Sequence, residues 1–127
     1  MIPRDLRYTS EHQWASRLET GRVAVGITDY AQKMLGDVVF IDLPKPGTKV
    51  VAGKPICSVE SVKAASDVFA PISGELITVN DQLSLEPERL NSDPYGTWIF
   101  EIIPTDPEDF FRLMEADAYK VLTEENS

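Results

Sequence analysis

One short segment combines a lysine with the small side chains that a modifying enzyme needs around its target. Residues 59–67 read V-E-S-V-K-A-A-S-D, with strand-forming residues on both sides. This pattern predicts a hairpin with Lys63 at or near its tip. A lysine at a tip projects its ammonium group away from the fold, and Ser61, Ala64 and Ala65 leave room around it. We interpret Lys63 as a candidate site of covalent modification. The alternative is a surface lysine that only interacts with solvent.

The other residues with reactive side chains are scarce. The chain has one histidine, His12, and one cysteine, Cys57. A single cysteine cannot form an internal disulfide or a CxxC pair, and a single histidine does not suit a zinc site. We interpret His12 as a structural hydrogen-bonding residue and Cys57 as a small apolar packing residue. We expect no metal site. A hydrolase or transferase acting alone would also lack a convergent acid–base cluster.

The segments before this lysine read as short strands and one short helix. Residues 22–27 alternate well enough to predict a strand with one buried face. Thr28 is typical of a helix N-cap, Asp29 suits the positive end of the helix dipole, and Gly36 fits the stop position. Residues 37–43 are rich in β-branched and aromatic side chains and predict the next strand.

Turn signals recur about every 8–12 residues through the middle of the chain, which is typical of a β-sandwich or small barrel. Further strands are expected at residues 49–51, 55–62, 67–70, 75–79 and 98–103. The sequence therefore predicts a mainly β fold.

The end of the chain changes character. Residues 105–123 predict a C-terminal helix, because Thr105 or Asp106 can cap it and Pro107 suits the first turn. Phe110, Leu113 and Met114 are spaced to form one apolar stripe. We interpret this segment as a helix that packs on the core, and we expect residues 124–127 to fray.

Length and charge narrow the classes of function. The 127 residues fit a single domain, residues 1–127, with its core at about 20–103. A net charge of −9 disfavours nucleic acid and anionic membrane surfaces as partners. No apolar stretch approaches the ~18 residues of a membrane span. Residues 1–8 are charged and contain no apolar signal core, so we expect a cytoplasmic protein, or one of the mitochondrial matrix in a eukaryote.

Several ordered motifs extend along most of the chain. They are Y-T-S-E-H-Q-W (8–14), V-G-I-T-D-Y-A-Q (25–32), L-G-D-V-V-F-I-D-L-P (35–44), E-S-V-K-A-A-S-D (60–67), A-P-I-S-G-E (70–75) and L-N-S-D-P-Y-G (90–96). Together they resemble the glycine cleavage system H protein family of lipoyl carriers. Biotinyl carriers also place a lysine at a hairpin tip, but they prefer flanking methionines, whereas Val62 and Ala64 stand here.

The resemblance implies a barrel-sandwich hybrid fold, with lipoate amide-linked to Lys63. The lipoyl group would supply the two sulfurs that Cys57 alone cannot. The implied function is a shuttle, not an enzyme. It carries the aminomethyl group from glycine decarboxylase to aminomethyltransferase and the dithiol to dihydrolipoamide dehydrogenase. A lipoate-attaching enzyme is a further implied partner, and we expect a monomer.

The resemblance also places a site around the lysine. The implied cofactor-binding residues are Lys63, Glu60, Ser61, Val62, Ala64, Asp67, Glu11, His12 and Gln13. Family members shelter the aminomethyl group in a cleft near the H-E-W segment, which maps here to His12 and Gln13, and near the acidic residue at Asp67. Gln13 stands where the family usually has an acid, so we hypothesise that Glu11 compensates. Thr78 replaces a common glutamate, and the segment at 94–98 is one residue short.

A lipoyl group on Lys63 would change the reach and the charge of the protein. Extended, the lysine and lipoyl chain would span about 10–15 Å, and acylation would change the net charge from −9 to −10. Such an acidic carrier is expected to dock on basic rims of its partners.

The alternatives to a glycine cleavage carrier are a lipoyl carrier for a sulfur-oxidising heterodisulfide-reductase-like complex or a lipoate relay, and a biotin carboxyl carrier.

Overall fold

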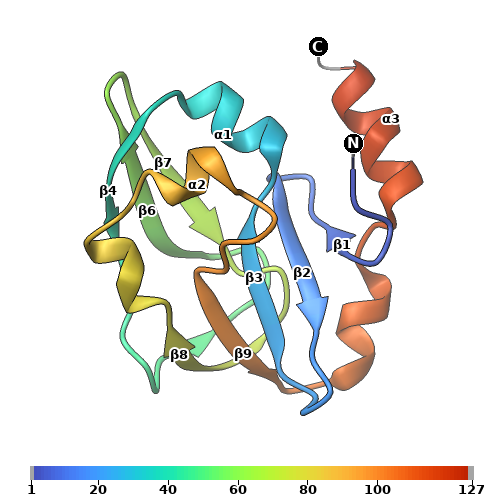
Figure 1. Ribbon diagram of the computed structural model, residues 1–127. Helices are drawn as coiled ribbons and strands as arrows, with labels where there is room; N and C mark the ends of the chain where they lie inside the picture. Colours follow the sequence, from blue (N-terminus) through green and yellow to red (C-terminus); the bar gives the residue numbers. More distant parts are fainter. Residues whose placement is uncertain (1, 126–127) are drawn as a thin grey trace.

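Two antiparallel sheets form the body of the protein (Figure 1). The computed structural model describes residues 2–125. In spatial order, the six-stranded sheet contains β1 (Arg7–Tyr8), β2 (Gln13–Arg17), β3 (Val23–Ile27), β9 (Phe100–Pro104), β8 (Gly74–Val79) and β5 (Lys49–Val50). The three-stranded sheet contains β4 (Val38–Asp42), β6 (Pro55–Ser61) and β7 (Ala65–Phe69). The mainly β fold expected from the sequence is confirmed.

The main core lies between the sheets. Along β3, Val23, Val25 and Ile27 face this core, and Cys57 and Val59 face it from β6. The alternate residues of β3 are small because Trp14 packs on the other face of that strand. A Cβ on Gly26 would lie 2.5 Å from the Trp14 ring. Both faces of β3 are therefore buried, although its sequence alternates between large and small residues rather than between apolar and polar ones.

Helix α1 (Asp29–Leu35) connects β3 to β4 and has the ends predicted from its sequence. The Thr28 side chain accepts a hydrogen bond from Ala31 N at 3.2 Å, which satisfies one of the free amides of the first turn. Gly36 ends the helix with φ +78°, a conformation that glycine adopts without steric cost.

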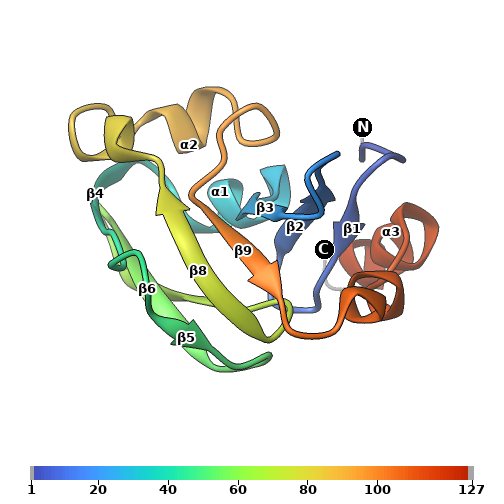
Figure 2. The ribbon, with the colours of Figure 1, turned by 90° about the horizontal axis from the view of Figure 1, so that it is seen from below.

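The predicted C-terminal helix is confirmed, but it is not continuous over residues 105–123. It is split into a 3₁₀ helix, η2 (Pro107–Arg112), and α3 (Ala116–Glu125). Between them, Met114 forms a β-bridge with Tyr8, with backbone hydrogen bonds of 2.8 and 3.0 Å. The expected single stripe is divided, because Phe110 packs in the main core while Met114 joins the second cluster under α3. Figure 2 shows α3 beside β1, on the far side of the six-stranded sheet. Residues 124–127 were expected to fray, but residues 124–125 still belong to α3. The expectation for 126–127 lies outside the described residues.

Two further parts of the chain were not assigned elements from the sequence. Strands β1 and β2 extend the core sheet to residue 7, so the core begins well before residue 20. A 3₁₀ helix, η1 (Asp81–Ser84), and the short helix α2 (Arg89–Ser92) precede β9. Across the described residues, no helix has the length and apolar character needed to cross a membrane.

Candidate functional site

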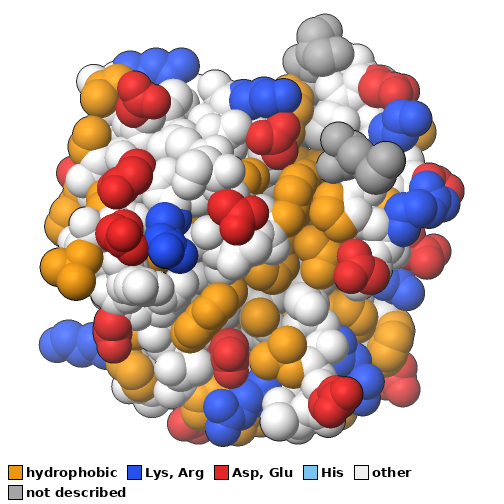
Figure 3. Space-filling model, in the orientation of Figure 1, with side chains coloured by type: hydrophobic (Ala, Val, Ile, Leu, Met, Phe, Trp, Pro, Cys, Tyr) orange, Lys and Arg blue, Asp and Glu red, His pale blue; other side chains and the backbone are white. Residues whose placement is uncertain are grey.

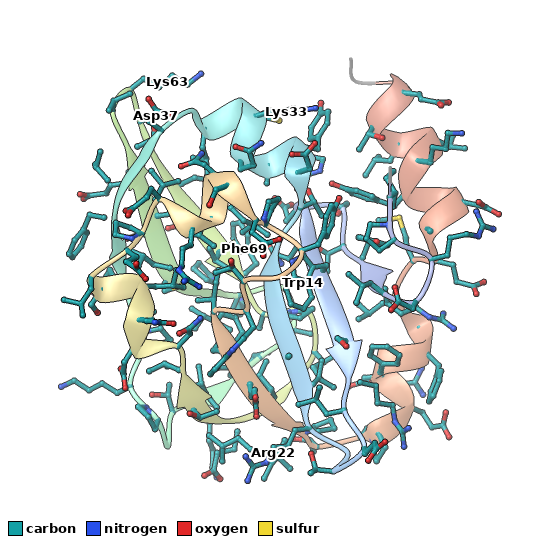
Figure 4. All side chains as sticks on the ribbon, in the orientation of Figure 1. Trp14, Arg22, Lys33, Asp37, Lys63 and Phe69 are labelled. Atoms are coloured by element: carbon teal, nitrogen blue, oxygen red, sulfur yellow. The ribbon has the colours of Figure 1, made fainter. Side chains whose placement is uncertain are left out.

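Lys63 lies in the tip of the β6–β7 hairpin, as the sequence predicted. Glu60 pairs with Ala65, and Lys63 is exposed in the turn between the strands (Figure 4). Ser61 shapes the turn: its Oγ donates to Ala64 O at 3.1 Å and accepts from the amides of Lys63 and Ala64 at 3.3 and 3.1 Å. The hydroxyl therefore fixes the backbone on both sides of the lysine while leaving its side chain free.

The hairpin tip is also attached to the end of α1. Val62 N donates to Asp37 O at 3.0 Å, and Val38 pairs with Ser61. A Cβ on Gly36 would lie 3.4 Å from Lys63 Cε, so the lysine stem passes over the last turn of α1. Among the described residues, Lys63 Nζ forms no ion pair. The amine is thus held at a defined place and remains accessible.

A cleft of about 280 Å³ opens beside the hairpin. It is lined by Glu11, His12, Gln13, Ile27, Ala31, Met34, Leu35, Val59, Ala64, Ala65, Ser66, Asp67 and Val68. The structure therefore brings together five of the residues expected at the site, which come from the β1–β2 turn, β2 and the hairpin. The other four expected residues, Glu60, Ser61, Val62 and Lys63, do not line the cleft: Glu60, Val62 and Lys63 are exposed, and Ser61 shapes the turn.

Helix α1 supplies an apolar wall that sequence reasoning did not assign to the site. Ala31, Met34 and Leu35 line the cleft from one side of the helix. From Ala31 to Leu35, four residue steps at 1.5 Å rise give this wall a length of about 6 Å. The shared face of these three residues was visible as helical spacing in the sequence, but nothing local indicated that the hairpin would lie opposite.

The polar lining of the cleft includes two carboxylates and an uncharged imidazole. Glu11 and Asp67 contribute the carboxylates. His12 has φ +68°, its Nδ1 lies 2.8 Å from Tyr119 Oη, and its ring lies against Tyr30 with centroids 4.5 Å apart. Burial lowers the pKa of His12, an effect that the nearby Glu11 partly opposes. The imidazole is therefore neutral at physiological pH and the cleft carries net negative charge. The hydrogen-bonding role predicted for His12 is confirmed.

Gln13 lies in the wall of the cleft with its amide already bonded. Its side chain is 1% exposed. The Nε2 group donates to Phe69 O at 2.8 Å, and Phe69 N donates to Oε1 at 3.3 Å. The position usually held by an acid therefore links β2 to β7 in this chain, and the charges of the cleft come from its neighbours.

Asn91 is a positioning residue. From the sequence, residues 91–96 were expected to form a turn, and the family resemblance implied a role in shaping the surface around the arm. Its Nδ2 donates to Gly36 O at 2.8 Å and to Gln32 Oε1 at 3.0 Å, while Val38 N donates to its Oδ1 at 2.8 Å. One side chain on α2 thereby fixes the junction of α1 and β4, over which the Lys63 stem passes. The signal in the sequence, an asparagine before S-D-P-Y-G, was equally typical of a turn.

The chain's only cysteine is buried in the main core, as predicted. Cys57 is 7% exposed, and burial raises the pKa of its thiol to about 12.

On the surface of the protein, acidic side chains are spread over the face seen in Figure 3, with basic side chains among them.

Comparison with known proteins decides between the candidate functions. The profile of the glycine cleavage H-protein matches residues 6–126. The chain belongs to the glycine cleavage H-protein family. It is 53% identical over 119 residues to a probable glycine cleavage system H protein of Pyrococcus abyssi, covering 93% of this chain and 89% of that protein. It is 54% identical over 125 residues to the glycine cleavage system H protein of Anaeromyxobacter sp. strain K, covering 98% of this chain and 97% of that protein.

A solved structure agrees with this assignment. The crystal structure of a glycine cleavage system H protein from Mycobacterium marinum has a TM-score of 0.87 and 37% identity, covering 97% of this chain and 99% of that one. The H-protein family is the lipoyl carrier of the glycine cleavage system, so the function expected from the sequence is confirmed.

Proposed function

We propose that this family member carries lipoate in amide linkage on Lys63 and shelters the far end of the arm in the cleft beside α1. The observation that carries the proposal is the position of Lys63: its exposed amine stands in a rigid hairpin tip, at the end of α1 that also borders the cleft. The other described lysines are exposed as well, but the cleft described above lies beside this hairpin.

The residues that line the cleft fit a lipoyl arm. Bound lipoate would supply a dithiolane that can be opened by reduction and can carry an aminomethyl cargo. Ala31, Met34 and Leu35 offer an apolar wall of about 6 Å to the chain of the arm. Glu11 and Asp67 place negative charge where a cationic cargo would lie.

We further propose that the chain acts as a carrier substrate and has no catalytic activity of its own. Its partners would be glycine decarboxylase, aminomethyltransferase, dihydrolipoamide dehydrogenase and a lipoate-attaching enzyme, which it would visit as a cytoplasmic monomer. The net charge of −9, and −10 after acylation, supports docking on basic rims of these enzymes. Association rates should then fall as salt rises.

Mass spectrometry after co-expression with a lipoate ligase tests the attachment site. We expect one lipoyl addition to the intact chain, located on the peptide that contains Lys63 and absent from Lys63→Arg. That variant keeps the positive charge but cannot be acylated. Lys54→Arg changes another exposed lysine in a tight turn and should be modified normally. A lipoyl group on Lys45, Lys49 or Lys54 in the native chain would overturn the site. A biotinyl mass would overturn the cofactor.

A further inference from the structure

A buried chain of hydroxyl groups leads from α1 through α3 to the cleft. Thr28 Oγ1 lies 2.7 Å from Tyr119 Oη, and Tyr119 Oη lies 2.8 Å from His12 Nδ1. Thr28 and Tyr119 are both 0% exposed. Tyr119 belongs to α3, far from the hairpin in sequence. Its contact with His12 nonetheless joins the C-terminal helix to the wall of the cleft.

The direction of these hydrogen bonds follows from the partners of Thr28. Within the described part of the chain, the Thr28 hydroxyl has two hydrogen-bonding partners. They are Ala31 N, which must donate to it, and Tyr119 Oη. The Thr28 hydroxyl proton therefore has Tyr119 Oη as its acceptor. The Tyr119 proton is then free to be donated onward to His12 Nδ1. The reverse direction would leave a buried hydroxyl proton without an acceptor, which is unfavourable.

This direction fixes the tautomer of His12. A neutral imidazole that accepts at Nδ1 carries its proton on Nε2. All buried side-chain nitrogen and oxygen atoms of the described residues have partners, and Nδ1 makes the one hydrogen bond found for the His12 ring among those residues. Nε2 is therefore accessible to solvent, and His12 is one of the residues that line the cleft. The accessible ring nitrogen of this cleft-lining residue is then an N–H group, with no lone pair that could take up a proton.

The distinction matters for a cargo bound as S–CH₂–NH₃⁺, the form that the proposed function implies. A base that removes a proton from the nitrogen frees its lone pair. That pair can form a C=N bond while the C–S bond breaks and its electrons leave with sulfur. Water then adds to the carbon, and formaldehyde and ammonia are released. An imidazole with a free Nε2 lone pair would be such a base.

We propose that Tyr119 is a positioning residue that holds the His12 proton on Nε2, so that His12 cannot act as a base toward cargo in the cleft. This inference rests on the proposed function for the presence of the cargo, but the tautomer itself does not depend on it. The low pKa of His12 supports the neutral ring that the geometry requires. The other titratable groups that face the imidazole or share its cleft are Glu11, Asp67 and Tyr30.

Nitrogen NMR on the unmodified protein tests the tautomer directly, since His12 is the only histidine in the chain. We expect a protonated Nε2 and an unprotonated Nδ1 at pH 7.5. Tyr119→Phe removes the hydroxyl and keeps the ring, which stacks on the Tyr8 ring with the centroids 4.7 Å apart. In this variant the population with the proton on Nδ1 should rise several-fold. Tyr8→Phe is the matched control, because its hydroxyl donates to Pro3 O and does not reach His12.

A second measurement follows the cargo on lipoylated protein charged by glycine decarboxylase with glycine labelled at its methylene carbon. Release of labelled formaldehyde should be several-fold faster in Tyr119→Phe than in the native chain or Tyr8→Phe. A native His12 protonated on Nδ1 would overturn the inference even if Tyr119→Phe failed to fold. Equal release rates in all three proteins would overturn the protective role. Failure of lipoate attachment would overturn the proposed function and leave the NMR result unaffected.

Discussion

Gln13 and Phe69 join the two sheets through a pair of hydrogen bonds that imitates a peptide pairing. The Gln13 amide donates to Phe69 O at 2.8 Å and accepts from Phe69 N at 3.3 Å. Gln13 begins β2 in the six-stranded sheet and Phe69 ends β7 in the three-stranded sheet. The side chain therefore satisfies both backbone groups of Phe69 where β7 meets no strand of the other sheet, and it closes the wall of the cleft.

Gln13→Glu is expected to destabilise the fold by about 1–3 kcal/mol at pH 7.5. A carboxylate cannot donate to Phe69 O, and it places a charge at a site that is 1% exposed. Urea unfolding measures the loss. Gln82→Glu, on the exposed surface of η1, is the matched control and should change stability by less than about 0.5 kcal/mol. If Gln13→Glu were as stable as Gln82→Glu, the Phe69 pairing would not be a structural requirement.

Asn91→Ala is expected to cost about 2–3 kcal/mol, because three polar groups lose their partner. These groups are Gly36 O, Val38 N and the side chain of Gln32. Ser92→Ala changes the next residue of α2, which is exposed, and should be close to neutral. Urea unfolding of both variants checks the prediction. Equal stabilities would show that water replaces the Asn91 amide at the end of α1.

Gly36→Ala and Gly21→Ala form a matched pair at positions with φ +78° and +89°. Alanine is strained at positive φ, so both variants should lose stability, and Gly36→Ala should lose more because ψ −160° places Gly36 in a region that is essentially restricted to glycine. They differ in surroundings: a Cβ at Gly36 meets Lys63 Cε at 3.4 Å, whereas Gly21 has open space. We expect only Gly36→Ala to slow lipoate attachment, measured as the initial rate of mass gain. Equal slowing in both variants would exclude the Lys63 contact as the cause.

Local patterns predicted the parts of the site that local chemistry determines. Thr28 and Gly36 mark the ends of α1 because capping and positive φ depend on single residues. The hairpin around Lys63 was predictable because alternation on both sides of small residues requires a turn. The family motifs then supplied five of the residues that line the cleft, which local patterns alone did not bring together.

The errors occurred where distant segments meet. Nothing near Met114 shows that it will pair with Tyr8, 106 positions earlier, and this pairing interrupts the helix that its own neighbours favour. The bonding of Gln13 to Phe69 and of His12 to Tyr119 is likewise invisible in the sequence, since each partner lies on another element. A polar side chain indicates that a partner is needed, but only the fold selects the partner.

Cys57 is expected to be inert toward thiol reagents in the folded protein. It is 7% exposed, and burial, reinforced by Asp42 and Asp67, raises the pKa of its thiol to about 12 from an ordinary value of 9.0. Thiolate is the reactive form, so both access and ionisation oppose the reaction. A reagent should count no thiols in the unmodified native chain and one in urea. The reduced lipoylated chain should give two, both from the arm. Unmodified Cys57→Ala should give no thiol either native or in urea, and its reduced lipoylated form should give two in both conditions.

The same shift predicts how stability depends on alkaline pH. The folded thiol keeps its proton to about pH 12, whereas the unfolded thiol loses it near its ordinary value of 9.0. The contribution of the thiol to stability is therefore complete below pH 9 and is lost as pH rises toward 12. The stability difference between the native chain and Cys57→Ala, measured by urea unfolding at pH 7.5 and pH 10.5, should shrink at the higher pH. A constant difference, or a native count of one reactive thiol, would contradict the burial of Cys57.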